Sequence, residues 1–279
     1  MIVILVLLSL YVLSLVYPFF WSLMATFKGR LEHAENPLAL PAAWKLDNFI
    51  GAFNKIKSDI VTDNGIRTVF IEEMLLNSLL YSIGGAFFNV LSSCILAYAT
   101  ARFDFKFSKV VYSVVIVTMI MPIVGSLPSE IQVAKNLGLY DNMIGMWVMK
   151  MGFVGLYYLI FYEVFKRVPR DFYEAAYVDG ASNLMVLVKI MLPLVSATFG
   201  TVMLIRFIDL WNDYTITMSL MPNIKTLAFG LFEFSTSAQV SSMPERLAGC
   251  FILILPVLTI FLLFNERIMG NISMGGIKE

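Results

Sequence analysis

Charged residues are scarce in this chain of 279 residues. Asp, Glu, Lys and Arg together make up only 14% of it, whereas 59% of the residues are apolar. Soluble domains usually carry about 25% charged residues, and the mean hydropathy of this chain is +0.79. The composition therefore excludes an ordinary soluble domain and places the chain in a lipid bilayer.

Residues that commonly bind metals or phosphate are also few. His33 is the only histidine, which excludes a histidine metal cluster, and Cys94 and Cys250 lie within apolar runs without the spacing of a metal site. A thiol in such a run usually behaves as a small hydrophobe. The absence of any Gly-Lys dipeptide excludes the Walker A phosphate-binding loop. We expect this chain to hold no metal, no cofactor and no catalytic residue, and we do not expect it to be an enzyme.

Long apolar runs, in contrast, fill most of the chain. A helix needs about 20 mainly apolar residues to cross the hydrocarbon core, and none of the runs alternates polar and apolar residues as an outer-membrane strand would. The sequence therefore predicts an all-α polytopic membrane protein with a single transmembrane domain over 1–279. Its six expected transmembrane helices cover residues 2–27, 75–99, 108–127, 143–165, 194–219 and 247–269.

The orientation of these helices is harder to predict. The first run has no basic residues before it and is longer than the apolar region of a signal peptide, roughly 7–15 residues, so we expect a retained helix. Basic residues of the short connections gather on the side of segment 166–193, as in cytoplasmic loops. The six basic residues of the long polar segment 28–74 nevertheless bring the two sides to equal totals, nine against nine, once the tail is included. Charge alone does not orient the chain. Segment 28–74 is too polar to cross and is expected outside the cytoplasm.

Segment 166–193 is polar and helix-prone, and it interrupts the apolar runs. Pro169 is typical of the first position of a helix, and the residues from Phe172 to Val178 are expected to form a short helix. Gly180 lets the backbone turn, and apolar residues recur at helical spacing from Ser182 to Leu192. The segment is therefore predicted to form a helix-turn-helix elbow.

The elbow is suited to contact another protein. An apolar helical surface with a charged rim fits a groove on a partner. The apolar contacts that we expect it to present are Tyr173, Tyr177, Leu184 and Met185. The alternative is an amphipathic segment that lies on the membrane surface without a partner.

A spaced motif runs through the elbow. It reads Glu174-Ala175-Ala176, three residues, Gly180, nine residues, Ile190, one residue, Leu192-Pro193. This spacing resembles the EAA motif of ABC importer permeases without insertion or deletion, and Asp179 before the glycine resembles the version found in carbohydrate importers. Further similarity to the smaller, six-helix permease subunit of the maltose-transporter-like group lies in the stretches LNSLL (76–80), LAYATARFDF (96–105), LWNDY (210–214) and GGIKE (275–279).

The resemblance implies that segment 166–193 is a cytoplasmic coupling loop held in a cleft of an ATP-binding subunit. The residues that it assigns to this contact are Glu174, Ala175, Ala176, Asp179 and Gly180. It also implies a related permease subunit, an ATPase dimer that uses ATP and Mg, and an extracellular solute-binding protein as partners, with no nucleic acid. The location implied is a prokaryotic inner membrane, with the C-terminus in the cytoplasm.

Ionisable residues inside the apolar runs suggest a solute pathway, because such residues are costly in a bilayer and usually face a cavity or a partner. Arg206 and Asp209 lie on one helical face and could instead form an internal ion pair. Aromatic residues near Asn212 would suit a sugar ring, although they could equally anchor a helix at the interface. The candidate residues of the pathway are Lys150, Arg206, Asp209, Trp211, Asn212 and Tyr214, and Asp213 is a further ionisable residue of the same run.

The sequence is thus interpreted as a permease subunit of an ATP-driven importer that forms half of the pathway for a carbohydrate. Two other classes remain open. An ion-coupled secondary transporter would normally show an internal repeat, and no convincing repeat occurs in the sequence. A membrane scaffold without transport activity would keep the elbow as a docking site but would need no polar path.

Overall fold

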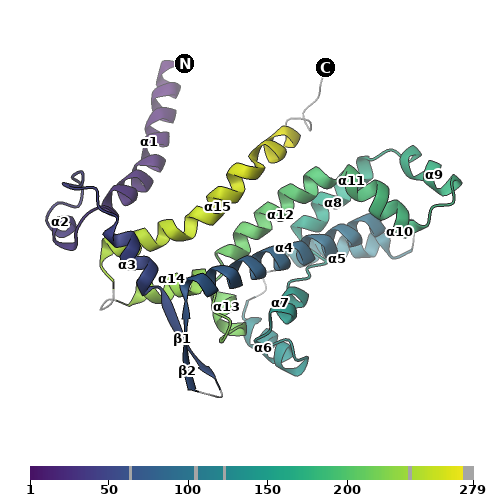
Figure 1. Cartoon of the computed structure of the whole chain (residues 1–279). Coiled ribbons are helices and arrows are strands. Elements are labelled where there is room, and N and C mark those ends of the chain that lie inside the picture. Colours follow the sequence, from purple (N-terminus) through teal and green to yellow (C-terminus); the bar gives the residue numbers. More distant parts are fainter. Residues whose placement is uncertain (63–64, 104–105, 122–123, 238–240, 273–279) are drawn as a thin grey trace. The chain divides into compact units, whose positions relative to one another are not determined.

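The computed structural model describes residues 1–62, 65–103, 106–121, 124–237 and 241–272, with side chains described as far as residue 263. Most of these residues are helical, and the described part of the chain also contains a single β-hairpin (Figure 1). The chain divides into two compact units. The first consists of residues 1–77 and 225–259, and the second consists of residues 78–224 and the chain from 260 onward.

The first unit holds the polar segment 28–74 between apolar helices. Its elements are α1 (Ile2–Ala25), α2 (Arg30–Glu35), α3 (Asp47–Lys55), β1 (Lys57–Thr62), β2 (Gly65–Phe70), α14 (Leu227–Thr236) and the first part of α15 (Met243–Ile272). Lys28 is buried at the start of the polar segment, and its ammonium donates to the carbonyls of Asn36, at 2.8 Å, and Pro37, at 3.2 Å. These charge-assisted bonds hold the turn after α1 closed.

The hairpin is a feature that the sequence analysis did not predict. Its strands pair in antiparallel register from Lys57 opposite Phe70 to Thr62 opposite Gly65. Only one face is buried, where Ile60 and Val69 are 5% and 0% exposed. The first strand reads KSDIVT, in which a buried Ser58 replaces one of the apolar residues that an alternating pattern requires. The period of two was therefore too weak to indicate a strand.

The second unit is a bundle of helices with α9 and α10 at one end and α6 and α13 at the other (Figure 1). It contains most of α4 (Ile71–Arg102), then α5 (Ser108–Ile120), α6 (Leu127–Asn136), α7 (Met143–Met149), α8 (Leu156–Arg167), α9 (Asp171–Val178), α10 (Asn183–Val186), a π-helical turn (Leu187–Met191), α11 (Leu192–Leu194), α12 (Ser196–Trp211) and α13 (Thr215–Leu220).

The core of the second unit lies between α4, α8 and the helices after the elbow. Tyr98 packs edge-on against Phe165, with ring centroids 5.5 Å apart, and Cys94 is a buried free thiol, as expected. Close approach depends on a small residue where α4 meets α7, because a Cβ at Gly84 would lie 2.2 Å from the ring of Trp147. Within a bilayer such packing gains van der Waals contact rather than hydrophobic free energy.

Three of the expected transmembrane helices are continuous. Among the described residues, the helices long and apolar enough to cross a membrane are Ile2–Ala25, Ile71–Arg102 and Met243–Leu263. They correspond to the predicted runs 2–27, 75–99 and 247–269, so the prediction of an all-α polytopic membrane protein is confirmed. The tail sequence GGIKE (275–279) lies outside the described residues.

The prediction of continuous helices over the other runs is wrong. The run 143–165 is divided between α7 and α8, and the run 194–219 is divided between α12 and α13. In the run 108–127, α5 ends at Ile120 and Leu127 begins α6, while residues 122–123 lie outside the described ranges. Helices 183–194 and 196–211 pass as one span only as a pair bent by 76°. A helix can break inside a membrane protein when its freed backbone groups find partners within the protein. The side chains around the break can then stay apolar. Hydropathy therefore does not detect breaks of this kind.

Candidate functional site

The first helix of the elbow, α9, ends in a Schellman turn. Ala181 N–H donates to the carbonyl of Ala176 at 2.9 Å, and Gly180 N–H donates to that of Tyr177 at 3.0 Å. Gly180 has a φ of +80°, the left-handed conformation that this turn requires after the last helical residue. A side chain at this position would strain the backbone, so the glycine of the spaced motif has a local structural reason.

The second helix of the elbow begins as the sequence predicts, at Ser182, whose hydroxyl accepts from Met185 N–H at 3.3 Å. It then widens into the π-helical turn Leu187–Met191 before Pro193. A proline ring clashes with the carbonyl four residues earlier in a regular helix, and that carbonyl belongs to Lys189 within the widened turn. The proline is thereby accommodated in the helix that leads back to the membrane.

The inner side of the elbow is attached to the bundle. Tyr173 and Tyr177 pack against its hydrophobic core, with their rings 6.1 Å apart. Arg102, at the end of α4, donates to the carbonyl of Val168 at 2.5 Å, and its guanidinium lies 4.7 Å from the ring centroid of Tyr173. Cation–π contact and hydrogen bond together connect α4, the end of α8 and α9.

The outer side of the elbow is exposed, and its composition corrects the prediction. Leu184 and Met185 are exposed as expected, but the two predicted tyrosine contacts face the bundle instead. The helical period places Phe172 and Val178 outward in their stead, with Val178 88% exposed. The sequence did not separate these faces because aromatic and aliphatic residues occur on both.

The charged residues of the spaced motif are exposed as well. Glu174 is in the first turn of α9, where a carboxylate is favoured by the helix dipole, and Asp179 follows its last residue. Both side chains are exposed, as is Ala175, whereas Ala176 is half-buried. Neither carboxylate forms an ion pair with another residue in the described ranges. The elbow therefore offers an apolar surface with two unengaged carboxylates.

Away from the elbow, the break between α7 and α8 is supported by α4. The amide of Asn89 donates to the carbonyl of Lys150 at 2.6 Å, and the hydroxyl of Ser93 donates to the carbonyl of Gly152. Asn89 and Ser93 are four residues apart and so lie on one face of α4. This pair was not predicted, although two polar residues at that spacing in an apolar run were a visible signal.

Two ion pairs lie near this break. Lys150 Nζ is 3.4 Å from Asp213 Oδ2, with both side chains less than one-fifth exposed, and the same carboxylate oxygen accepts from the hydroxyl of Tyr81 at 3.0 Å. Arg206 and Asp209 form the internal ion pair that their spacing allows, at 3.7 Å. Each candidate cation is therefore matched by a carboxylate, and Asp213 joins the site although it was not among the predicted pathway residues.

The aromatic part of the predicted pathway is only partly available. Trp211 is 1% exposed and packs beside Phe207, with ring centroids 5.6 Å apart, so it offers no surface to a solute in this structure. Asn212 is exposed and donates to the carbonyl of Ile208 at 2.9 Å, and Tyr214 is 38% exposed. Trp211 is thus a packing residue in this structure. Its position at the end of an apolar run did not indicate this role.

A polar cavity lies where α4, the α7–α8 break, α8 and α12 meet. It has a volume of about 300 Å³ and brings predicted residue Arg206 together with residues that were not predicted. The residues that line it are Asn89, Ser93, Gly152, Val154, Leu156, Tyr157 and Arg206. Tyr157 also donates from its hydroxyl to Asp209 at 3.2 Å. The cavity combines polar groups with apolar walls, as ligand sites do.

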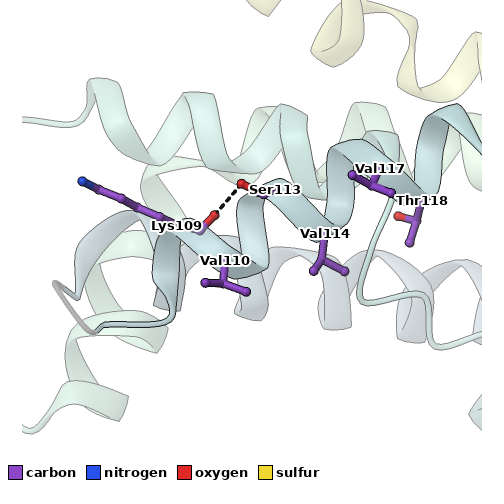
Figure 2. A pocket seen from close by; sticks show the side chains of 6 residues that line it. All are labelled: Lys109, Val110, Ser113, Val114, Val117 and Thr118. Atoms are coloured by element: carbon purple, nitrogen blue, oxygen red, sulfur yellow. Dashed lines mark hydrogen bonds between the residues drawn. The ribbon is translucent and has the colours of Figure 1, made fainter.

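A second hollow, on the surface of α5, differs in kind. Figure 2 shows its lining side chains, all from that helix, with Lys109 at one end and Val110, Val114 and Val117 along it. The only hydrogen bond drawn there is local, from the hydroxyl of Ser113 to the carbonyl of Lys109 at 2.9 Å. Because one helix supplies every lining residue, this hollow is an apolar helix face and not a formed solute site.

Comparisons with known proteins agree with this arrangement. Residues 74–270 match the family described as binding-protein-dependent transport system inner membrane component. The chain is 27% identical over 274 residues to the diacetylchitobiose uptake system permease protein of Streptomyces coelicolor, covering 96% of this chain and 86% of that protein. It is also 27% identical over 275 residues to a probable starch degradation products transport system permease protein of Thermoanaerobacterium thermosulfurigenes, covering 96% and 94%.

A solved structure shares the fold. It is the crystal structure of a bacterial ABC transporter involved in the import of the acidic polysaccharide alginate. Its matching chain is 23% identical to this one with a TM-score of 0.73, and the likeness covers 95% of both chains. The fold similarity therefore extends over nearly the whole length of both chains.

Proposed function

The chain belongs to the binding-protein-dependent transport system inner membrane components, and we propose that it forms half of the solute pathway of an ATP-driven importer for a carbohydrate. That family is one of membrane transport permeases and not a class of enzymes. Relatives along nearly the whole chain are named for the transport of diacetylchitobiose and of starch degradation products, which supports a carbohydrate as the solute.

The observation that carries the proposal is the two-sided elbow. Its inner side is attached to α4 and α8 through Arg102 and Tyr173, and its outer side presents Glu174 and exposed apolar residues. An amphipathic helix with this distribution docks into a groove of another protein. The partner in the proposal is an ATP-binding subunit, with Glu174, Ala175, Ala176, Asp179 and Gly180 at the contact.

Coupling then has a mechanical basis. When ATP closes the ATPase dimer, the docked elbow moves with it, and its attachment to α4 and α8 carries the movement into the bundle. The residues of α4 that hold the α7–α8 break would move together with that helix, because α4 is a continuous helix from Ile71 to Arg102. A rigid element that links two sites is the physical requirement for such coupling.

The proposal also fixes the assembly. The chain pairs with a related permease subunit in the bilayer, docks on one subunit of an ATPase dimer that uses ATP and Mg, and receives solute from an external binding protein. It binds no cofactor and no nucleic acid itself. In this arrangement segment 166–193 and the C-terminus are cytoplasmic, and segment 28–74 with its hairpin is on the outer side. The ion-paired residues Lys150, Arg206 and Asp209 border the solute path.

The test of docking is charge reversal of Glu174, with Glu163 as the matched control. Both carboxylates are exposed, but Glu163 lies on α8 outside the elbow. Glu174→Lys should reduce co-purification of the ATPase with the permease pair and reduce ATP-driven uptake of diacetylchitobiose, trehalose or maltotriose in proteoliposomes. Glu163→Lys should leave both unchanged. Normal association and uptake in the Glu174→Lys complex would contradict the proposed docking.

A further inference from the structure

The cavity at the α7–α8 break contains polar atoms without partners. Asn89 is only 7% exposed, and its amide nitrogen is engaged by the carbonyl of Lys150, but its Oδ1 accepts no hydrogen bond within the described part of the chain. The Nε of Arg206 is likewise buried and unpartnered within the described residues, although Nη1 of the same side chain faces Asp209. Two residues that line the cavity thus carry one buried acceptor and one buried donor without a partner in the described part of the chain.

Such atoms are costly, which makes their placement informative. A buried polar group without a partner costs about 1–3 kcal/mol relative to a satisfied one. Native structures keep few of them, and each calls for a physical reason. Here both atoms belong to residues that line the same cavity of about 300 Å³. A ligand that satisfies both at once would remove the cost of both.

The type of ligand follows from this donor and acceptor set. A carboxylate only accepts hydrogen bonds and would leave Asn89 Oδ1 unsatisfied, whereas an ammonium only donates and would leave Arg206 Nε unsatisfied. A hydroxyl does both. The nearby charges are already paired, Lys150 with Asp213 and Arg206 with Asp209, so the site has no excess charge to attract an ion.

The size and the walls of the cavity narrow the ligand further. Its volume is at the lower end of the roughly 300–1,000 Å³ of ligand sites, which suits one ring rather than a chain of rings. Val154 and Leu156 supply apolar wall, and Tyr157 supplies an aromatic one. A pyranose ring presents hydroxyls at its edge and C–H groups on its faces, and it therefore matches both the polar atoms and the walls.

We propose that this cavity is a subsite for a single neutral sugar ring, in which Asn89 Oδ1 accepts from one ring hydroxyl and Arg206 Nε donates to another. The inference rests on the proposed carbohydrate import, but it goes further, because forming half of the pathway does not require this subunit to hold a sugar ring in a defined subsite. It assigns Asn89, Ser93 and Tyr157 to the solute path and leaves buried Trp211 outside it.

The test is protection of a cysteine in the cavity wall, measured in the complete importer with its sister permease, ATPase and binding protein in proteoliposomes. Val154→Cys places a thiol in the wall, and Val148→Cys is the matched control, because Val154 and Val148 are 45% and 46% exposed but only Val154 lines the cavity. Cys250 is replaced by Ser in both, while Cys94 is buried and stays. Alkylation of this chain by N-ethylmaleimide is followed by mass spectrometry of its peptides.

The probes are diacetylchitobiose, trehalose and maltotriose, each added separately. A probe that the importer takes up should slow alkylation in the Val154→Cys variant by about tenfold at a concentration near ten times its dissociation constant. Alkylation in the Val148→Cys variant should not change. Adding Asn89→Ala should abolish the protection, because the acceptor is removed.

Two results would overturn the inference. Uptake of a probe without protection in the Val154→Cys variant, or with equal protection in the Val148→Cys variant, would exclude the subsite while leaving carbohydrate import intact. Uptake of none of the probes by the unsubstituted importer would reject carbohydrate import, and the subsite with it. If the Val154→Cys importer does not assemble, Leu156→Cys in the wall and Leu137→Cys outside it, 58% and 66% exposed, provide the same comparison.

Discussion

Replacing Lys150 by Met should destabilise the second unit, because it leaves the carboxylate of Asp213 without its cation. The two charged atoms are 3.4 Å apart, and the side chains are 15% and 17% exposed. The carboxylate keeps two other donors, the hydroxyl of Tyr81 at 3.0 Å and the backbone N–H of Ile216 at 3.0 Å. The charge that remains is therefore hydrogen-bonded but no longer neutralised.

The size of the effect can be bounded from this geometry. At an effective dielectric constant of ~20, the attraction between unit charges at this separation is about 5 kcal/mol, before the cost of desolvating them is subtracted. Removing one partner of a buried pair usually costs about 3–5 kcal/mol. Because two donors remain, we expect a loss at or just below the lower end of that range, about 2–3 kcal/mol. At roughly 2–4 °C per kcal/mol, this lowers the melting temperature by about 4–12 °C.

The assay is thermal unfolding of the purified importer in detergent, with the fraction that remains monodisperse measured after heating. Lys150→Met is compared with Lys150→Met/Asp213→Asn, in which neither charge remains. The double variant should recover at least half of the lost stability. Arg67→Met is the control, because it also removes a cation from an ion pair but the partners there are 58% and 36% exposed, so its effect should stay below about 1 kcal/mol.

The reasoning would be refuted by two patterns of melting temperatures. If Lys150→Met melts at the same temperature as the unsubstituted importer, Asp213 is not stabilised by this cation. If the double variant is no more stable than the single one, the loss comes from packing of the lysine side chain and not from an uncompensated charge. Either pattern would also remove the argument that the charges around the polar cavity are already neutralised.

Three further predictions concern backbone conformation, packing and coupling. Gly180→Ala should destabilise the elbow by about 1 kcal/mol, because φ is +80° at this position, and should weaken co-purification of the ATPase. Gly200→Ala is the control, because a Cβ there likewise meets nothing within 4 Å, and it should leave co-purification unchanged. Equal effects of the two substitutions would show that the turn conformation is irrelevant. Gly84→Ala should lower the melting temperature by the equivalent of about 1–3 kcal/mol, because its Cβ would lie 2.2 Å from Trp147. Combining it with Trp147→Phe should recover part of the loss. An unchanged melting temperature of Gly84→Ala would contradict the close contact. Arg102→Leu should reduce the amount of solute taken up per ATP hydrolysed, while the ATPase still co-purifies. Arg102→Lys should retain only part of the normal ratio of uptake to hydrolysis, because lysine lacks the planar group that stacks on an aromatic ring. A normal ratio in Arg102→Leu would exclude this residue from coupling.

Local features of the elbow could be predicted from the sequence because short-range chemistry decides them. Gly180 takes the left-handed conformation, and Ser182 caps the second helix, as residue type alone indicates. The faces of the elbow could not be predicted in the same way. Tyr173 and Phe172 are neighbouring aromatic residues, yet one packs on the bundle and the other is 52% exposed. Which of them faces inward depends on where α4 and α8 lie.

The polar cavity shows the same limit more sharply. Arg206 and Asp209 could be paired from their spacing alone, because three residues along a helix place them on one face. The partner of Lys150 could not, since Asp213 lies 63 residues away and no local rule connects the two. Asn89 carried a polar signal in an apolar run, but only the tertiary contact shows that it supports a helix break.

By itself, the sequence determined that the chain is a membrane protein and that a spaced motif interrupts its apolar helices. It also determined the residue at which the backbone turns within that motif. These properties depend on composition and on neighbours within a few residues, which the order of amino acids fixes directly. The tertiary structure alone decided where the long apolar runs break and which polar groups meet at the breaks. The reason is physical: in a bilayer a broken helix survives only when side chains from distant segments satisfy its freed backbone groups, and their meeting is a property of the packed bundle.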